Sequence, residues 1–214
     1  MLDYDFMKSY LQDLAAVIIQ QKDNLNRLDA ECGDGDFGVG MYIGFQSAQQ
    51  AILESKRDDI GVLLNEVGRA ILSSVGGASG PLYGTLFIES GKVVTGKREI
   101  DLKDLSRMFR NALERIRQRG AASVGDKTLV DALEPAVASL REAAENRVDM
   151  LQAIEMAVET ARIGCESTKS LMARHGKARY LGEQTLGHMD PGAYVVTLIF
   201  QTLLSHCRSH SVSS

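Results

Sequence analysis

The residues from Asp101 to Ile116 read Asp-Leu-Lys-Asp-Leu-Ser-Arg-Met-Phe-Arg-Asn-Ala-Leu-Glu-Arg-Ile and space their apolar side chains by three and four positions. This spacing places Leu102, Leu105 and Phe109 on one face of a helix with 3.6 residues per turn. Asp101 stands where an N-cap residue would accept a free backbone N–H. The stretch therefore predicts an amphipathic α-helix that packs one face against a core.

The same spacing recurs along the 214-residue chain, whereas the two-residue alternation of half-buried strands is nearly absent. Proline occurs only three times, so long stretches can remain helical. The spacing predicts about eight helical segments, over residues 3–22, 38–54, 58–73, 80–94, 101–118, 128–143, 148–174 and 191–207. We therefore expect an all-α fold of antiparallel amphipathic helices, with a single domain over residues 1–208 and a frayed tail over 209–214.

Composition and charge exclude several classes of protein. The chain carries 24 Lys and Arg against 28 Asp and Glu, a formal net charge of −4, so it offers no basic face to nucleic acid. Its three cysteines are too widely spaced for a disulfide framework or a CxxC metal clip, which favours the reducing cytoplasm. The apolar run over 193–204 is shorter than the ~20 residues of a membrane span, and the first residues do not resemble a signal peptide. We expect a cytoplasmic protein with no nucleic-acid or membrane partner.

Three aspartates, Asp29, Asp34 and Asp36, stand in a segment whose glycines permit sharp turns, so their carboxylates can converge on one point of an expected loop. Carboxylates this close repel one another unless a hard cation such as Mg²⁺ or Ca²⁺ neutralises them. A plainer alternative is that these acids only cap helix starts. An EF-hand is excluded because Phe45 occupies the position of its bidentate glutamate. The segment predicts a metal site, with helix capping as the open alternative.

A second glycine cluster, from Gly76 to Gly84, leads into an expected helix with Pro81 near its first turn. Backbone N–H groups at such a helix start can hold an anionic phosphate. Close crossing of two helices through small residues is the alternative, and the cluster by itself does not decide between the two.

A third segment, from Gly120 to Thr128, resembles a Walker A loop, but Asp126 separates its second glycine from Lys127 and an expected helix precedes it. A P-loop is therefore excluded, because that motif follows a strand and joins the lysine directly to the glycine. Here we expect Thr128 to cap the next helix and Lys127 to be solvated.

The segment from Gly176 to Gly192 is rich in glycine and carries cationic and amide side chains between two expected helices. A connection of this length and composition is typical of a binding loop. His188 is the tempting catalytic group, yet ordering of the loop beside Asp190 is the favoured interpretation. For His175 we expect the role of a charge at a helix C-terminus.

Taken together and in this order, these motifs resemble the L subunit of dihydroxyacetone kinase, the nucleotide-binding DhaL family. The resemblance spans nearly the whole chain and rests on these segments: Asp29 with Gly33–Asp36, Val75–Gly84, Gly125–Thr128 and Gly176–Gly192. It implies a barrel of about eight antiparallel helices that holds ADP or ATP in loops at one end.

Carried over residue by residue, the resemblance implies a ligand set. Asp29, Asp34 and Asp36 would ligate two Mg²⁺ ions on the phosphates of the nucleotide. No side chain is assigned as catalytic. The nucleotide itself would be held by Phe37, Gly38, Val39, Gly40, Gly77, Ala78, Ser79, Gly120, Thr128, Leu129, Lys177, Asp190, Pro191 and Gly192.

The resemblance also implies an activity and partners. In the family, the L subunit passes the γ-phosphate of its nucleotide to a short ketose held on a separate K subunit, and a phosphohistidine on an M subunit of the phosphotransferase system recharges the bound ADP. Phosphoryl transfer asks a protein mainly for positioning and charge neutralisation, so no side-chain nucleophile is required. Pairing of the chain with a second copy is left open.

Three positions depart from the family pattern. Phe37 and Gly40 stand where the family usually has His and Asn, and Lys177 replaces the usual Arg. A phenylalanine donates no hydrogen bond to a phosphate, and a lysine lacks the bidentate fork of an arginine. The alternatives are therefore a diverged paralogue that uses another short ketose or free ATP, and a non-catalytic module that senses nucleotides.

Overall fold

The computed structural model describes residues 1–76 and 79–211 of the chain, and most of these residues are helical. Two short strands in them, β1 (Leu2–Asp3) and β2 (Glu99–Ile100), pair antiparallel. The helices are α1 (Tyr4–Gln20), α2 (Lys22–Ala30), α3 (Phe37–Glu54), α4 (Ile60–Ser74), α5 (Ser79–Val93), α6 (Leu102–Gly120), α7 (Leu129–Glu145), α8 (Met150–Ser167) and α9 (Pro191–Ser211), with 3₁₀ turns η1 (Thr168–Ser170) and η2 (Ala178–Thr185). The expected all-α class is confirmed.

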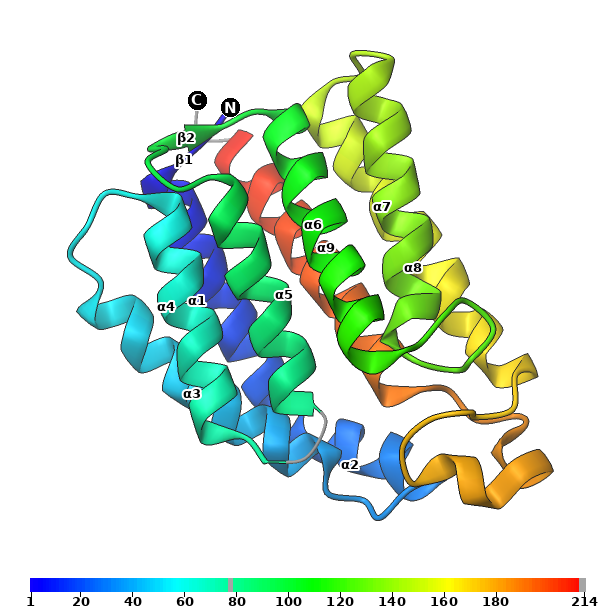
Figure 1. The fold of residues 1–214 in the computed structure, drawn as a ribbon. Helices are drawn as coiled ribbons and strands as arrows, with labels where there is room; N and C mark the ends of the chain where they lie inside the picture. Colours follow the sequence, from blue (N-terminus) through cyan, green and yellow to red (C-terminus); the bar gives the residue numbers. More distant parts are fainter. Residues whose placement is uncertain (77–78, 212–214) are drawn as a thin grey trace.

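The long helices contact one another in a closed order (Figure 1). Contacts run through α1, α3, α4, α5, α6, α7, α8 and α9, and α9 packs against α1. Because the chain reverses after each long helix, alternate connections lie at the same end of the molecule. Residues 31–36, 121–128 and 168–190 lie with α2 at the end opposite the two termini (Figure 1). Segments far apart in the sequence are thereby gathered at one end.

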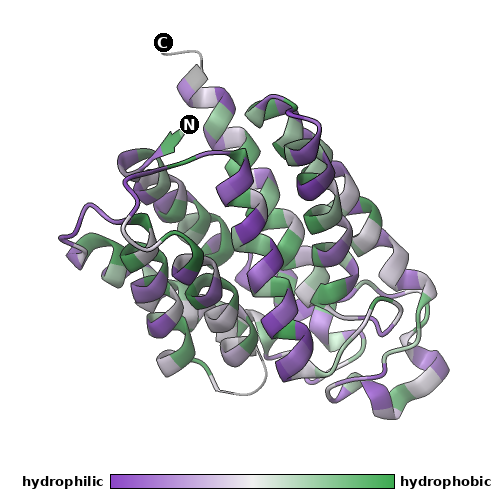
Figure 2. Ribbon diagram, turned by 45° about the horizontal axis from the view of Figure 1, so that its top comes forward, coloured by the Kyte–Doolittle hydropathy of each residue, from purple (hydrophilic) through white to green (hydrophobic). Residues whose placement is uncertain are grey.

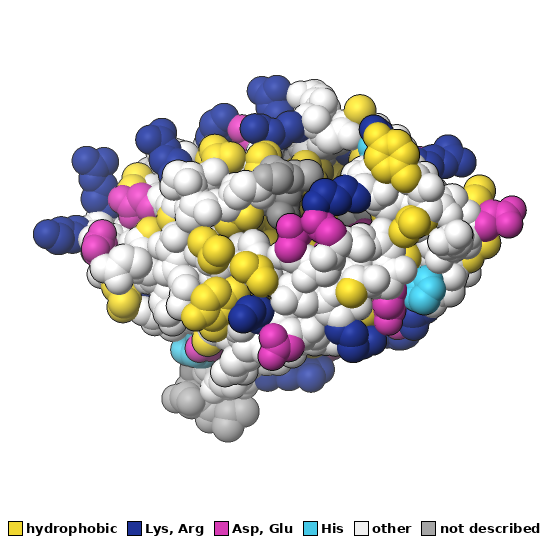
Figure 3. Space-filling view, turned by 90° about the horizontal axis from the view of Figure 1, so that it is seen from below, with side chains coloured by type: hydrophobic (Ala, Val, Ile, Leu, Met, Phe, Trp, Pro, Cys, Tyr) yellow, Lys and Arg dark blue, Asp and Glu magenta, His cyan; other side chains and the backbone are white. Residues whose placement is uncertain are grey.

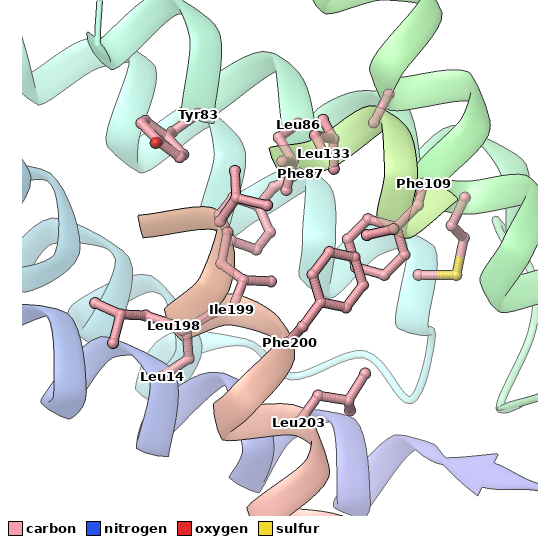
Figure 4. Packing of buried hydrophobic residues seen from close by; sticks show 14 of the residues in the cluster. Leu14, Tyr83, Leu86, Phe87, Phe109, Leu133, Leu198, Ile199, Phe200 and Leu203 are labelled. Atoms are coloured by element: carbon pink, nitrogen blue, oxygen red, sulfur yellow. The ribbon is translucent and has the colours of Figure 1, made fainter. Parts of the chain in front are cut away.

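A single hydrophobic core lies inside this arrangement. In Figure 2 the helices show a hydrophilic and a hydrophobic side, which is the amphipathic pattern expected of them. Side chains of α9 occupy the middle of the core (Figure 4), where the rings of Phe109 and Phe200 lie 4.7 Å apart between centroids. Full burial of each such side chain contributes about 1.5–3 kcal/mol. The packing of the core therefore fixes the positions of the helices, and with them the loops that join their ends.

Some boundaries differ from those expected. The segment predicted over 3–22 ends at Gln20, and a separate helix, α2, follows it. That helix is short and polar and buries only Leu25 and Leu28, so its periodic signal is weak. The helix predicted over 148–174 ends at Ser167 and gives way to η1.

The C-terminal helix is longer than expected. Residues 209–211, predicted to be frayed, belong to α9, whereas 212–214 lie outside the described residues. His206 fastens this end of α9 to α1: its Nδ1 lies 2.7 Å from Oδ2 of Asp13, and its Nε2 lies 2.8 Å from Oγ of Ser9. The imidazole is buried, so these bonds are protected from solvent. Over residues 1–76 and 79–211 no helix is both long and apolar enough to span a bilayer.

Candidate functional site

Asp29 lies in the last turn of α2, so the expectation that all three aspartates share one loop is wrong for this residue. Its Oδ2 accepts the backbone N–H groups of Asp36 (3.1 Å) and Phe37 (3.3 Å) at the start of α3. Gly33 makes room for the carboxylate, because a Cβ there would lie 2.5 Å from Oδ1 of Asp29. Gly35, with φ of +76°, turns the chain back toward α2. Asp29 thus fixes the loop between α2 and α3.

The three aspartates converge. One carboxylate oxygen each from Asp29, Asp34 and Asp36 lies within 4.8 Å of the other two. Asp36 occupies the N-cap position of α3, yet its side chain makes no capping bond. Helix capping therefore explains the position of Asp29 but not that of the other two carboxylates. An oxygen-only, partly exposed donor set fits a hard cation such as Mg²⁺.

The charges of this cluster interact strongly. Burial raises the pKa of Asp29, and the neighbouring Asp34 carboxylate raises it further, while backbone N–H groups oppose the shift. The ammonium group of Lys177 donates to Oδ2 of Asp34 and lowers the pKa of Asp34. Seen from below, acidic side chains lie directly beside a cationic one near the middle of this face (Figure 3). The cluster already attracts a cation from the protein itself.

The loop over 168–190 also contacts the two residues that follow α2. Nδ1 of His188 lies 3.1 Å from Oε2 of Glu31, and Sγ of Cys32 contacts the carbonyl oxygen of Thr185 at 3.9 Å. His188 thus orders the loop through Glu31, whereas the sequence suggested Asp190 as its partner. His175 lies 3.2 Å from Oδ2 of Asp126 and pairs with the α6–α7 turn.

The first turn of α3 carries the next expected binding residues, Phe37, Gly38, Val39 and Gly40. Gly38 allows α3 to approach α2 closely, because a Cβ there would lie 2.0 Å from the carbonyl oxygen of Lys22. The N–H of Val39 donates to Oδ1 of Asn26 (3.0 Å). Phe37 packs its ring against the hydrophobic core. This turn therefore offers backbone and shape to a ligand, and no polar side chain.

The starts of α7 and α9 lie side by side. A Cβ on Gly192 would lie 3.5 Å from Cβ of Leu129, and the hydroxyl of Tyr83 on α5 donates to the carbonyl oxygen of Gly192 (2.8 Å). Oγ1 of Thr128 accepts the N–H of Val130 (3.2 Å), so Thr128 caps α7 as expected. These contacts bring Thr128 and Leu129 together with the turn of Asp190, Pro191 and Gly192.

The remaining expected residues are placed in part. Gly120 ends α6, where a Cβ would lie 3.6 Å from Cδ2 of Leu82 near the start of α5. Ser79 begins α5. Gly77 and Ala78 lie outside the described residues. The end of α6 and the start of α5 therefore meet at the same end of the molecule as the aspartates (Figure 1).

Lys127 is buried, so the expectation that its side chain is solvated is wrong. The residue is only 5% exposed, and its ammonium group donates to the carbonyl oxygens of Thr168 (2.7 Å) and His188. The sequence does not indicate this burial, because a lysine beside a helix start is usually solvated. A local signal does exist: Asp131 stands three residues after Thr128, the spacing of a capping box that fixes the turn.

Asp190 caps α9 from a protected position. Its Oδ2 accepts the N–H of Ala193 (2.7 Å), its own N–H donates to Oγ1 of Thr168 (3.0 Å), and burial raises its pKa to about 7. Because the folded pKa exceeds the usual 3.8, the folded state keeps a proton that the unfolded state has released. The contribution of Asp190 to stability is therefore present at low pH and falls as the pH rises from about 4 to about 7.

The variant Asp190→Asn tests this linkage, because an asparagine oxygen can still accept the N–H of Ala193. We expect the free energy of unfolding of the wild type, relative to D190N, to fall by about 3 kcal/mol between about pH 4.5 and 7.5. Denaturant unfolding of both nucleotide-free proteins across this range measures the difference. Parallel pH profiles would contradict a raised pKa.

The helices form a closed arrangement, and one end of it gathers convergent carboxylates, a lysine and several helix starts. These features define the class, an all-helical protein with a candidate metal and phosphate site. The chain belongs to the DAK2 domain family, whose model matches residues 31–205. It is 38% identical over 195 residues to the ADP-binding subunit DhaL of the PEP-dependent dihydroxyacetone kinase of Escherichia coli, covering 91% of this chain and 93% of that protein.

Two further comparisons agree with this family. The ADP-binding subunit DhaL of PEP-dependent dihydroxyacetone kinase 2 of Listeria innocua is 36% identical over 209 residues, covering 97% of this chain and 96% of that protein. The crystal structure of the dihydroxyacetone kinase from C. freundii in complex with AMP-PNP and Mg²⁺ matches with a TM-score of 0.71 and 25% identity. The match covers 93% of this chain and 33% of that longer chain. The expected resemblance to kinase subunits that bind ADP is confirmed.

Proposed function

We propose that this chain is the nucleotide-binding phosphotransfer subunit of a dihydroxyacetone-type kinase in the cytoplasm. It holds Mg-ADP or Mg-ATP at the loop end and passes the γ-phosphate to a short ketose bound on a separate K subunit. A phosphohistidine on an M subunit recharges the ADP. The observation that carries this proposal is the convergence of the oxygens of Asp29, Asp34 and Asp36 to within 4.8 Å.

Different residues at this end would bind the metal and the phosphates. Asp29, Asp34 and Asp36 would hold the magnesium, which supplies charge neutralisation at the phosphates when bound. Lys177 is exposed and adjacent, so its ammonium group can move from Asp34 to a phosphate oxygen. The starts of α3, α7 and α9 place positive helix ends at this end of the molecule, which suits an anionic phosphate chain.

The first test is whether the protein holds a nucleotide. Native mass spectrometry of protein purified without added nucleotide, and again after addition of Mg-ADP, is expected to show a complex with nucleotide and metal. A protein that carries no nucleotide in either sample contradicts the proposal.

The second test is transfer of the phosphate. With a K subunit loaded with dihydroxyacetone, loss of phosphate from the bound ATP is expected, and an M-subunit phosphohistidine is expected to restore it. Transfer only to a different short ketose, or only with free ATP in excess, would identify a diverged paralogue. Binding without transfer to any ketose would favour a sensing module, the alternative that Phe37 and Gly40 suggest.

A further inference from the structure

Lys127 lies inward because the turn around it is fixed on both sides. Asp131, itself buried, accepts the N–H of Gly125 (2.6 Å) with one oxygen and the N–H of Thr128 (2.7 Å) with the other. Between these two anchors Lys127 has φ of +59°, a left-handed conformation that a lysine rarely adopts. The surroundings therefore hold this side chain in the interior at a cost in backbone conformation.

The ammonium group of Lys127 joins two points that are distant in sequence. It donates to the carbonyl oxygens of Thr168 and His188, which stand at the two ends of the loop that carries Lys177. Thr168 also accepts the N–H of Asp190 through its hydroxyl oxygen (3.0 Å). One buried cation thus joins Thr168 and His188, which form the neck of the loop, and Thr168 in turn bonds the residue that precedes α9.

The same α6–α7 turn meets this loop a second time, farther out. The carbonyl oxygen of Asp126 accepts the N–H of Arg174 (3.1 Å), and the carboxylate of Asp126 pairs with His175. These outer contacts do not involve the side chain of Lys127. Loss of the Lys127 ammonium group would therefore loosen the neck of the loop while leaving its outer attachment in place.

We propose that Lys127 is a positioning residue for the nucleotide: its ammonium group closes the loop over 169–187 and so places Lys177 and the turn from Asp190 to Gly192 at the phosphate chain. The nucleotide in this inference rests on the proposed function, whereas the bonds that join the two ends of the loop do not. Burial lowers the pKa of Lys127, and the nearby acidic groups of Asp190 and Asp131 oppose that shift. The carbonyl bonds thus compensate a group that is costly to bury.

The test compares Lys127→Met, which keeps the volume and loses the charge, with a control of similar instability. Leu140→Ala removes a fully buried side chain farther along α7 and leaves the neck contacts untouched. We expect K127M to bind Mg-ADP at least ~10-fold more weakly, about 1.4 kcal/mol, and to be cleaved faster by trypsin at Arg174, Lys177 and Arg179. L140A is expected to lose stability without either change.

Chemical rescue separates charge from volume. In Lys127→Ala, added ethylammonium is expected to restore slow cleavage of the loop, whereas ethanol, which is neutral, is not. If K127M does not fold, Lys127→Gln replaces it, since its amide keeps N–H donors but is too short to serve both carbonyls fully.

The proposal is overturned if folded K127M, or K127Q in its place, is cleaved at the wild-type rate and binds Mg-ADP with wild-type affinity. It is also overturned if ethanol rescues K127A as well as ethylammonium does. If the wild type itself fails to bind Mg-ADP, the proposed function fails, and the cleavage rates measured without nucleotide still decide whether Lys127 closes the loop.

Discussion

Asp36→Ala is expected to abolish retention of Mg-nucleotide while the protein keeps its helical content. The carboxylate of Asp36 belongs to the convergent cluster but makes no capping bond to α3, so the variant removes a candidate ligand and little stability. We expect the affinity for Mg-ADP to fall at least ~100-fold, about 2.7 kcal/mol. Isothermal titration calorimetry with Mg-ADP measures the affinity, and circular dichroism measures the helical content.

Asp23→Ala is the matched control for this variant. Asp23 is exposed in the first turn of α2 and lies outside the cluster, so its loss removes one negative charge without removing a candidate ligand. The affinity of D23A for Mg-ADP should stay close to that of the wild type. A folded D36A protein that binds Mg-ADP like D23A would contradict the assignment of Asp36 to the metal.

Gly164→Ala is expected to have the largest effect on stability. Gly164 lies where α8 crosses α7, and a Cβ there would stand 2.1 Å from the carbonyl oxygen of Asp131. Backbone atoms cannot rotate away, so the two helices must separate. Against a helix-propensity gain of about 1 kcal/mol, we expect a net loss of about 3 kcal/mol in the free energy of unfolding. This loss corresponds to roughly 10 °C in Tm, which calorimetry can measure.

Gly76→Ala provides the comparison at a glycine where an added methyl group has open space. Its backbone is not in the left-handed region, and an added Cβ meets no atom within 4 Å in the described structure. We expect its free energy of unfolding to change by less than about 0.5 kcal/mol. Equal Tm values for G164A and G76A would show that α7 and α8 tolerate the extra methyl group.

The long helices and the acidic cluster could be predicted from sequence because their signals are local. Apolar periodicity indicates which face of a helix is buried, and the spacing of Asp29, Asp34 and Asp36 indicates convergence whether the first of them ends a helix or stands in a loop. The position of α2 could not be predicted as well, because a short polar helix depends on contacts with α3, such as the one that Gly38 permits.

The partners of Lys127 and His188 could not be predicted, because they are distant in the chain. Lys127 bonds to backbone carbonyls at residues 168 and 188, and no side-chain pattern indicates which carbonyl a lysine will reach. His188 stands two residues before Asp190 in the sequence, yet the loop brings it to Glu31 instead. Long-range contacts of this kind follow from how the loop packs on the ends of the helices.

The reversal of the chain after every long helix has an evolutionary consequence. The end that carries the candidate site consists of connections between long helices, and it lies opposite the two termini (Figure 1). A connection can thus acquire new residues, or lengthen, with a modest entropic penalty and without repacking the interior. Chains built this way can diverge in what they recognise while their architecture stays constant.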